Sequence, residues 1–386
     1  MRPTRGADVD VVVVTGSAGL VGGEAVRVLA DRFDLVVGID NMMRRDFLGA
    51  AAVGAAVEAP PNHRHHAVDV RDLEALGAVL REYGSDVRLV VHAAGQPSAE
   101  WAADAPLVDF EVNALGTVTA LEAVRRWCPE AVVVVVSSRR VYGAAPDALP
   151  LVETATRWEV DPAHPYHEHG VDESLRLDRV DRTFLGVSKL AADLAAQEYG
   201  RRLGMAVGVF RCGSLAGARH AGVELDGFLS HLVRSAVRGA AFRVIGHGGK
   251  QVRDVLDARD LVEMFWQFYL SPRPGEVYHA GGGRERGASV LEFIARYEYL
   301  TGREVRFDYA PDHRFADVRW WLTDTRKFRR DYPDWRPVHD PSDVLLSLHR
   351  HWSGTALDLG GSGGVEFVHH GSPRLSGDAA AREESL

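Results

Sequence analysis

The chain has 386 residues, 46% hydrophobic and 26% charged, an ordinary globular composition with ample apolar material for a large core. Its 45 basic and 54 acidic side chains give a formal charge of −9, which argues against a general attraction for nucleic acid. Two cysteines are too few for a disulfide framework, and no apolar run reaches the roughly 18 residues of a membrane span. We therefore expect a soluble, cytoplasmic protein with no nucleic-acid partner, no membrane partner and no metal centre.

Short β-branched runs alternate with segments of helical spacing along the first half of the chain. Continuous apolar runs are typical of buried strands in a parallel sheet, because both faces of such a sheet pack against helices. Strands and helices in this alternation form right-handed βαβ units. The sequence predicts a Rossmann-type doubly wound α/β fold with strands at 9–15, 35–40, 65–69, 87–94, 131–137 and 205–211, and helices at 18–31, 73–83, 106–127 and 185–203.

Two stretches interrupt this pattern. Residues 42–61 are alanine-rich and end in two prolines, which indicates an insertion with some helix. Residues 144–182 form a long polar stretch, and long loops in compact domains are often lids or binding segments. Beyond residue 211 the pattern is mixed. We expect a first domain at 1–211 to which parts of 244–270 return, a smaller mixed substrate lobe at 212–350 and a flexible tail at 353–386.

The most specific feature is the glycine-rich turn TGSAGLVG at 15–22, between the first predicted strand and the first predicted helix. Its glycines allow a tight turn and let backbone N–H groups approach a pyrophosphate at the helix N-terminus. Asp40 ends the second strand at the position expected for a carboxylate that binds ribose hydroxyls and repels a 2′-phosphate. Arg44 and Arg45 follow and weaken the preference against NADP only slightly. The pattern predicts NAD as the cofactor.

The predicted cofactor site also draws on small and polar residues at later strand ends and on two helices. Small side chains at the end of the fourth strand allow a cofactor backbone to pass closely. The predicted cofactor-binding residues are Gly16, Ala18, Gly19, Leu20, Val21, Gly22, Asp40, Asn41, Asp69, Val70, Ala93, Ala94, Gly95, Asn113, Ser137, Lys189 and Phe210.

A family resemblance follows from the order of these motifs with HAAGQPS at 92–98, SSRRVYG at 137–143 and the pair Ser188–Lys189. The chain resembles the extended short-chain dehydrogenases/reductases, also called the NAD-dependent epimerase/dehydratase family. Within it, residues 9–340 look most like the CDP-paratose/CDP-tyvelose 2-epimerase group, through the motifs GIDN, HGVDES, GVSKLAAD, GKQVRD and GGGRE at 38–41, 169–174, 186–193, 249–254 and 281–285.

The resemblance implies tightly held NAD and a nucleotide-linked hexose as the small-molecule substrate. It implies transient oxidation of a hydroxyl and return of the hydride on the other face, with no net redox change. It also implies a homodimer joined by the helices at 104–127 and 184–203. Two alternatives stay open, namely an unusual NAD-dependent dehydratase acting on a nucleotide sugar or a nucleoside, and a catalytically silent NAD-binding protein.

The catalytic residues depart from the family at one position. The resemblance implies that Ser138 hydrogen-bonds the reacting oxygen and that Lys189 binds the nicotinamide ribose. A tyrosine four residues before the lysine is the proton acceptor in the family, but here that position is Leu185. The open alternatives for its replacement are Tyr166 and His167 in the 144–182 stretch, Cys212, and a water relayed through Ser138 and Lys189.

Several of the predicted substrate-binding residues are arginines. Arg139 and Arg140 stand where related dehydratases carry an Asp-Glu pair, and guanidiniums cannot serve as an acid–base pair. Arg253 lies in a motif whose arginine meets the diphosphate in the family. Residues 220–228 are a candidate nucleotide-base segment, and Trp320 and Trp321 either stack on a base or pack in the core. The predicted substrate-binding residues are Gln96, Ser98, Ser138, Arg139, Arg140, Leu185 and Arg253.

Overall fold

The computed structural model describes residues 9–48, 59–218, 220, 222–224, 227–310 and 317–354. Met1–Thr355 forms one compact unit, and residues 356–386 lie outside the described residues. Most of the predicted tail at 353–386 therefore falls outside as well, although Ser353 still belongs to the last helix. In the described part of the chain, no helix combines the length and the apolar character needed to cross a membrane.

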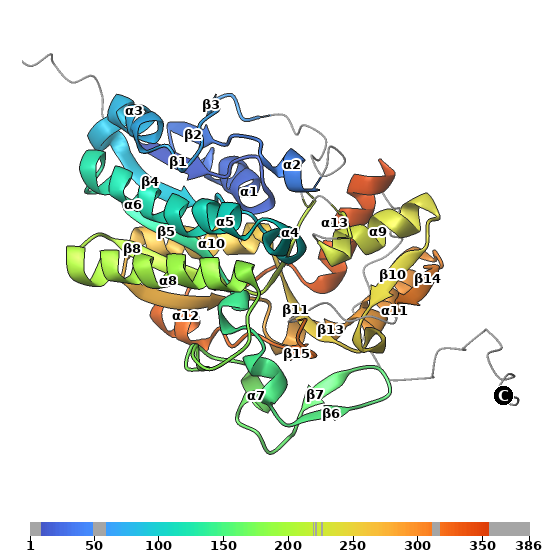
Figure 1. The fold of residues 1–386 in the computed structure, drawn as a ribbon. Helices are drawn as coiled ribbons and strands as arrows, with labels where there is room; N and C mark the ends of the chain where they lie inside the picture. Colours follow the sequence, from blue (N-terminus) through green and yellow to red (C-terminus); the bar gives the residue numbers. More distant parts are fainter. Residues whose placement is uncertain are drawn as a thin grey trace, which may run out of the picture. The chain divides into compact units, whose positions relative to one another are not determined.

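A seven-stranded parallel sheet forms the centre of the compact unit (Figure 1). The strand order β12-β8-β5-β4-β1-β2-β3 and the parallel pairing of every neighbouring pair confirm the predicted doubly wound fold. Its strands are β1 (Val11–Thr15), β2 (Leu35–Ile39), β3 (His63–His66), β4 (Val87–His92), β5 (Val132–Ser138), β8 (Val207–Cys212) and β12 (Glu276–Ala280).

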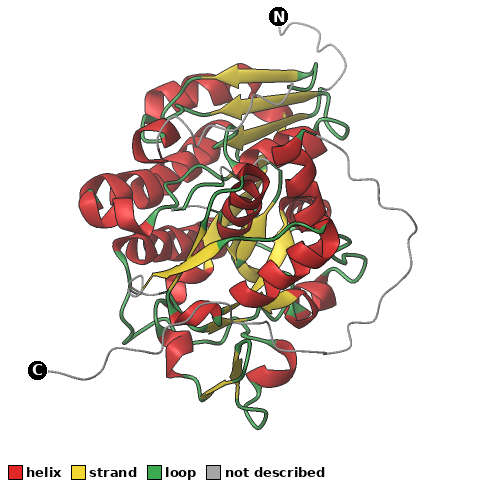
Figure 2. Cartoon of the chain, turned by 90° about the vertical axis from the view of Figure 1, so that its right-hand side faces the viewer, coloured by secondary structure: helices red, strands yellow, loops and turns green. Residues whose placement is uncertain are grey.

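Helices cover both faces of this sheet (Figure 2), and the strand sequences show why. In β1, Val12 and Val14 pack into the core on one face, and Val11 and Val13 pack into the core on the other. A strand buried on both sides needs a continuous apolar run, which is what this valine run supplies. One face is covered by α1 (Leu20–Leu29), α10 (Ala258–Leu270) and α12 (Arg326–Asp331), the other by α3 (Leu73–Tyr83), α6 (Gly116–Trp127) and α8 (Phe184–Leu203).

Two predicted elements differ from the structure. The helix expected at 106–127 is divided into α5 (Pro106–Phe110), the π-helical turn η3 (Glu111–Leu115) and α6, and it is preceded by α4 (Ala99–Asp104). Such π-turns recur at functional sites, because the extra residue rotates the side chains that follow it. The third strand, β3, begins earlier than predicted. It is a half-exposed edge strand, so it lacks the apolar run by which buried strands are located in a sequence.

The second half of the chain builds a lobe beside the sheet and also returns to it. The helix α10 and the strand β12 rejoin the sheet layers, whereas β9 (Ser214–Ala216) pairs with β11 (Val252–Asp257) outside them. The division at residue 212 stays a prediction. The lobe also contains α9 (Phe228–Arg238), β10 (Phe242–Ile245), η6 (His247–Gly249), η7 (Arg284–Arg286), β13 (Gly287–Ser289), α11 (Val290–Thr301), β14 (Phe307–Ala310), β15 (Trp320–Trp321) and α13 (Pro341–Ser353).

The long polar stretch at 144–182 contains regular structure of its own. A small hairpin and a short helix pack, together with η4 (Arg139–Tyr142), around the buried Trp320 and Trp321. This packing explains why so long a connection is ordered. The remaining elements are η5 (Ala145–Ala148), β6 (Leu151–Glu153), β7 (Trp158–Val160) and α7 (Tyr166–His169), with α2 (Arg44–Leu48) and η2 (Gly84–Asp86) earlier in the chain.

Candidate active site

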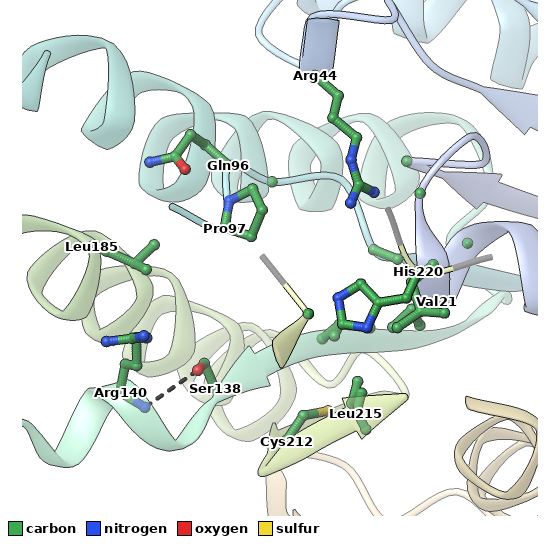
Figure 3. A pocket seen from close by; sticks show the side chains of 18 of the residues that line it. Val21, Arg44, Gln96, Pro97, Ser138, Arg140, Leu185, Cys212, Leu215 and His220 are labelled. Carbon is green, nitrogen blue, oxygen red and sulfur yellow. Dashed lines mark hydrogen bonds between the residues drawn. The ribbon is translucent and has the colours of Figure 1, made fainter. Parts of the chain in front are cut away.

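A cavity of about 470 Å³ opens at the carboxyl ends of the parallel strands (Figure 3). The glycine-rich turn after β1 lines one end, and Ser138, Leu185 and the arginines after β5 line the other. Ligands of open α/β sheets bind at this edge, because the strand order reverses there and the connections diverge. Most of the predicted cofactor and substrate residues therefore meet in one cavity.

The glycine-rich turn has no room for side chains. Gly16 has a φ of +69°, and a Cβ there would lie 2.6 Å from the amide nitrogen of Ala94. A Cβ on Gly22 would lie 2.1 Å from the carbonyl oxygen of Gly16. Gly19 is the N-cap of α1, and no described side chain caps that helix end. The backbone N–H groups of the first turn are thus available to a pyrophosphate, which fits a dinucleotide.

Two carboxylates line the cavity wall beside this turn. Asp40 Oδ2 accepts a hydrogen bond from the Ala18 amide at 3.0 Å, so the carboxylate is fixed against the start of α1. Asp69 accepts paired hydrogen bonds from the Arg71 guanidinium and one from Asn41 Nδ2 at 2.9 Å. The Arg71 hydrogen bonds hold the pKa of the Asp69 carboxyl below its usual value, which favours its ionised form.

Two side chains that are distant in the sequence meet the backbone just after β4. Gly95 follows Ala93 and Ala94, and a Cβ on it would lie 2.6 Å from Lys189 Nζ and 2.8 Å from Asn113 Oδ1. Only glycine leaves space for both groups at this point. Because Gly95 has no side chain, the side chain of Lys189 can reach the cavity from α8.

Behind this wall lies a buried polar network centred on Asp109, which sequence reasoning missed. Asp109 Oδ1 accepts hydrogen bonds from Gln96 Nε2 at 2.7 Å and Asn113 Nδ2 at 2.9 Å, and Oδ2 accepts one from Ser188 Oγ at 2.6 Å. Burial raises the pKa of the Asp109 carboxyl. Asn113 therefore lies behind the cavity and does not line it. The only sequence signal for the buried network was the pair Asp109 and Asn113, which stand four residues apart.

Ser98, predicted to touch substrate, is likewise outside the cavity lining. It is fully buried as the N-cap of α4, where its Oγ accepts a hydrogen bond from the Trp101 amide at 3.1 Å. Its hydroxyl is engaged because a helix start needs an acceptor for its first N–H groups. Gln96, by contrast, both lines the cavity and joins the buried network.

Ser138, Leu185 and Lys189 come together at the far end of the cavity. Ser138 ends β5, and its Oγ accepts a hydrogen bond from the Arg140 amide at 3.2 Å. Leu185 is 3% exposed and forms an apolar wall, one helical turn before Lys189 on α8 (Figure 3). Burial lowers the pKa of the Lys189 ammonium, and the Asp109 carboxylate acts in the opposite direction.

Three guanidiniums share this end of the cavity with one carboxylate. Arg253 is 5% exposed, and its Nη2 donates to Asp317 Oδ1 at 2.6 Å. Burial lowers the pKa of the Arg139 guanidinium, and the nearby charges of Arg253 and Arg140 lower it further. Burial opposes ionisation of Asp317, but the three arginines hold its pKa below the usual value. The resulting excess of positive charge suits phosphate oxygens.

Three predicted site residues lie away from the cavity. Tyr166 OH donates to Asp172 Oδ1 at 3.4 Å, and His167 Nε2 contacts Arg284 Nη2 at 3.4 Å. Their catalytic assignment is not supported, because the 144–182 stretch packs around Trp320 and Trp321 instead of covering the cavity. Phe210 is fully buried in an aromatic cluster on one face of the sheet. It lies two residues before the end of β8, so it does not reach the cavity at the strand ends.

Other candidates from the sequence are also placed. Trp320 and Trp321 are both buried core residues, so neither stacks on a ligand. Cys212 lines the cavity, but burial raises the pKa of its thiol to about 12, which keeps it protonated. The segment 220–228 is only partly described, and its residues His220, Glu224, Gly227 and Phe228 line the cavity.

Comparison with known proteins agrees with this geometry. Residues 12–281 match the family described as NAD dependent epimerase/dehydratase. The CDP-paratose 2-epimerase of Salmonella typhi is 30% identical over 347 residues, which cover 88% of this chain and 98% of that protein. The dTDP-glucose 4,6-dehydratase of Escherichia coli is 23% identical over 368 residues, covering 88% and 92%. The UDP-glucose 4-epimerase of Thermus thermophilus, solved with NAD, superposes with a TM-score of 0.71 at 23% identity and covers 90% of this chain and 100% of that one.

Proposed function

Because this chain belongs to the NAD-dependent epimerase/dehydratase family, we propose that it binds NAD in the cavity and epimerises a nucleotide-linked hexose there. The observation that carries the proposal is one continuous cavity that joins the glycine-rich turn, the Ser138–Lys189 pair and Arg253. When bound, NAD accepts a hydride from the sugar carbon and returns it, which the protein's side chains cannot do.

The residues at the cofactor end support NAD over NADP. The uncapped start of α1 offers N–H groups to the pyrophosphate, and the Asp40 carboxyl beside it suits free ribose hydroxyls. Arg44 also lines the cavity and points into it (Figure 3), but the carboxylate lies nearer the turn through its bond to Ala18. A 2′-phosphate would meet that carboxylate.

The residues at the reacting end support a nucleotide-linked sugar. Arg253, with Arg139 and Arg140 beside it, supplies forked donors for a diphosphate. Ser138 holds the reacting oxygen, and Gln96 contacts the ring from the opposite wall. The named relatives act on CDP-, UDP- and dTDP-linked sugars, and the CDP-paratose enzyme makes C2 our first candidate for the reacting carbon.

Leu185 favours a second candidate function. The missing phenol leaves room for a different NAD-cycling reaction, in which a proton also leaves the carbon beside the transient ketone, such as dehydration of a nucleotide sugar or a nucleoside. Arg139 and Arg140 oppose the usual form of that reaction, because neither exchanges a proton near neutral pH. A catalytically silent NAD-binding protein is the third alternative.

One experiment separates these functions. The purified protein is assayed for copurifying NAD and then incubated in heavy water with CDP-, UDP- and dTDP-hexoses and with nucleosides. Epimerisation predicts an inverted carbon without deuterium, because the same hydride returns. Dehydration predicts loss of water with deuterium at the neighbouring carbon. Bound NAD without any turnover supports the silent protein, and a chain that cannot hold NAD refutes all three.

A homodimer is part of the same proposal. Exposed apolar side chains lie on α5 and on the neighbouring α8, including Leu107 (69% exposed), Phe110 (45%), Phe184 (54%) and Leu194 (46%). Contiguous apolar surface of this kind is typical of interfaces. Light scattering should give twice the chain mass, and Phe184→Asp should lower it. A monomeric wild type contradicts this part of the proposal.

A further inference from the structure

The reacting end of the cavity has few groups that can carry a proton. Near Ser138 the described cavity lining holds Cys212, Lys189, the arginines and Asp317, whose pKa the arginines hold below its usual value. A guanidinium stays protonated throughout the physiological range, and the Cys212 thiol has its pKa raised to about 12 by burial. With Leu185 in place of the family's phenol, Lys189 is the one described side chain at this end whose two protonation states are both accessible.

Two buried histidines, His92 and His279, do not compete. Burial lowers the pKa of His92 to about 3, and its ring nitrogens hydrogen-bond Thr15 Oγ1 at 2.8 Å and Thr117 Oγ1 at 3.0 Å. His279 is equally engaged, with Tyr142 OH at 2.7 Å and the carbonyl oxygen of Val171 at 2.9 Å. Neither ring lines the cavity.

The position of the Lys189 amine matches the role. Lys189 lies one turn after Leu185 on α8, so it projects from the same helix face into the same cavity. Its Nζ lies beside Gly95, where a Cβ would come within 2.6 Å. Among the described residues Lys189 makes no hydrogen bond or ion pair, whereas Lys250 pairs with Glu153 at 2.7 Å and Lys327 pairs with Glu276 at 2.7 Å.

The composition of the chain points the same way. Lysine supplies only three of the 45 basic side chains, and arginine supplies the rest. The described cavity lining holds five arginines and a single lysine, Lys189. Arginine and lysine differ above all in that only the amine can lose its proton.

We propose that Lys189 itself is the proton acceptor and donor of this enzyme, in place of the family's phenol. The inference rests on the proposed function, since it assumes that a sugar hydroxyl is oxidised beside bound NAD. The O–H bond breaks and its proton forms an N–H bond on the neutral Nζ, while the hydride of the same carbon goes to the oxidised nicotinamide. Return of both restores the hydroxyl, so no further oxidant, reductant or base is needed.

The charges around Lys189 tune this exchange. Burial favours the neutral amine, and the facing groups are Asp109 from α5, Cys212 from β8 and His92 from β4. The Asp109 carboxylate favours the ammonium, so it is a positioning residue that keeps the pKa of the amine from falling further. Asp109→Asn should therefore lower the pKa of Lys189.

The direct test is a lysine titration by NMR. With only three lysines, protein labelled at lysine Cε and saturated with NAD gives three resolvable signals, and Lys189→Arg assigns one by its loss. We expect the Lys189 signal to titrate below the ordinary lysine value of about 10.4, because burial disfavours its charged form. In Asp109→Asn the Lys189 midpoint should fall further. A Lys189 signal that titrates together with the other two overturns the inference.

A second test uses the nucleotide sugar identified by the panel. Lys189→Arg keeps a cation at this position but removes the group that can accept a proton near neutral pH, so reduction of bound NAD should slow by about 100-fold or more. The matched control Lys327→Arg changes a paired lysine away from the cavity and should keep the wild-type rate. Turnover by Lys189→Arg with an unchanged pH profile overturns the inference alone. Absence of NAD, or of turnover by the wild type, refutes the proposed function, and the NMR titration still decides whether Lys189 is a competent base.

Discussion

The two ends of the cavity are built in different ways. The cofactor end depends on backbone geometry, because Gly16, Gly19 and Gly22 leave the start of α1 open and Asp40 is held by a backbone amide. The reacting end depends on side chains from separate elements, Ser138 and Lys189 among them. A backbone cradle tolerates almost no substitution, whereas a site made of side chains can be rebuilt one residue at a time. The departure at Leu185 lies at the second end.

The largest expected effect tests the backbone end. Gly22→Ala places a Cβ 2.1 Å from the Gly16 carbonyl oxygen, so the turn must open and NAD affinity should fall by about 100-fold or more. Calorimetric titration with NAD measures it. Gly239→Ala is the control, since that C-cap has a positive φ but no atom near its Cβ position and lies outside the cavity lining. An unchanged NAD affinity in Gly22→Ala would remove the glycine turn from the site.

The next effect tests the side-chain end. Arg253→Lys loses the buried forked donor, and the KM for a nucleotide sugar should rise roughly 10- to 100-fold, while NAD affinity stays within about twofold. Arg259→Lys, in a pair with Asp257 outside the cavity lining, controls for a general loss of arginine. An equal loss of affinity for NAD and for the nucleotide sugar would show that the two ends do not bind separate ligands.

A smaller effect concerns cofactor choice. Asp40→Asn keeps an acceptor for the Ala18 amide but removes the charge, so NAD should weaken by about tenfold and discrimination against NADP should shrink. Fluorescence titration with both nucleotides measures the ratio. The exposed Asp46 on the nearby α2 offers the control Asp46→Asn. If the ratio of the two affinities does not move, Asp40 does not set the preference.

The smallest effect is on stability and comes from His92, beneath the junction of the two ends. Its folded pKa of about 3 lies below the unfolded value of about 6.5, so the unfolded chain binds more protons between these values. Stability is therefore retained above about pH 6.5 and lost as pH falls toward 3, by up to about 1.4 kcal/mol per pH unit. When urea unfolding is measured at several pH values, the free energy of unfolding of His92→Gln should fall less steeply with falling pH than that of the wild type. The exposed control His65→Gln should not show this change. The same pH dependence of the free energy of unfolding in wild type and His92→Gln would contradict this assignment to His92.

Most residues that the sequence assigned to the cofactor line the cavity, and their role in binding NAD stays a prediction. The glycine spacing, Asp40 and the strand ends at Ala93 and Ala94 are local features, and each lines the cavity. At the reacting end the sequence located Ser138, Leu185 and Lys189 through the family pattern. It placed Tyr166 and His167 wrongly because nothing local indicates that a polar stretch packs on two buried tryptophans.

The order of strands and helices, the parallel sheet and the dinucleotide turn were determined by the sequence itself, because they depend on periodicity and on glycine at fixed spacing. The tertiary structure alone decided which polar groups meet. Asp109, Asn113 and Ser188 form one buried network because α5 and η3 pack against α8. Such contacts join residues far apart in the chain, and their energies depend on burial and geometry that no short segment contains.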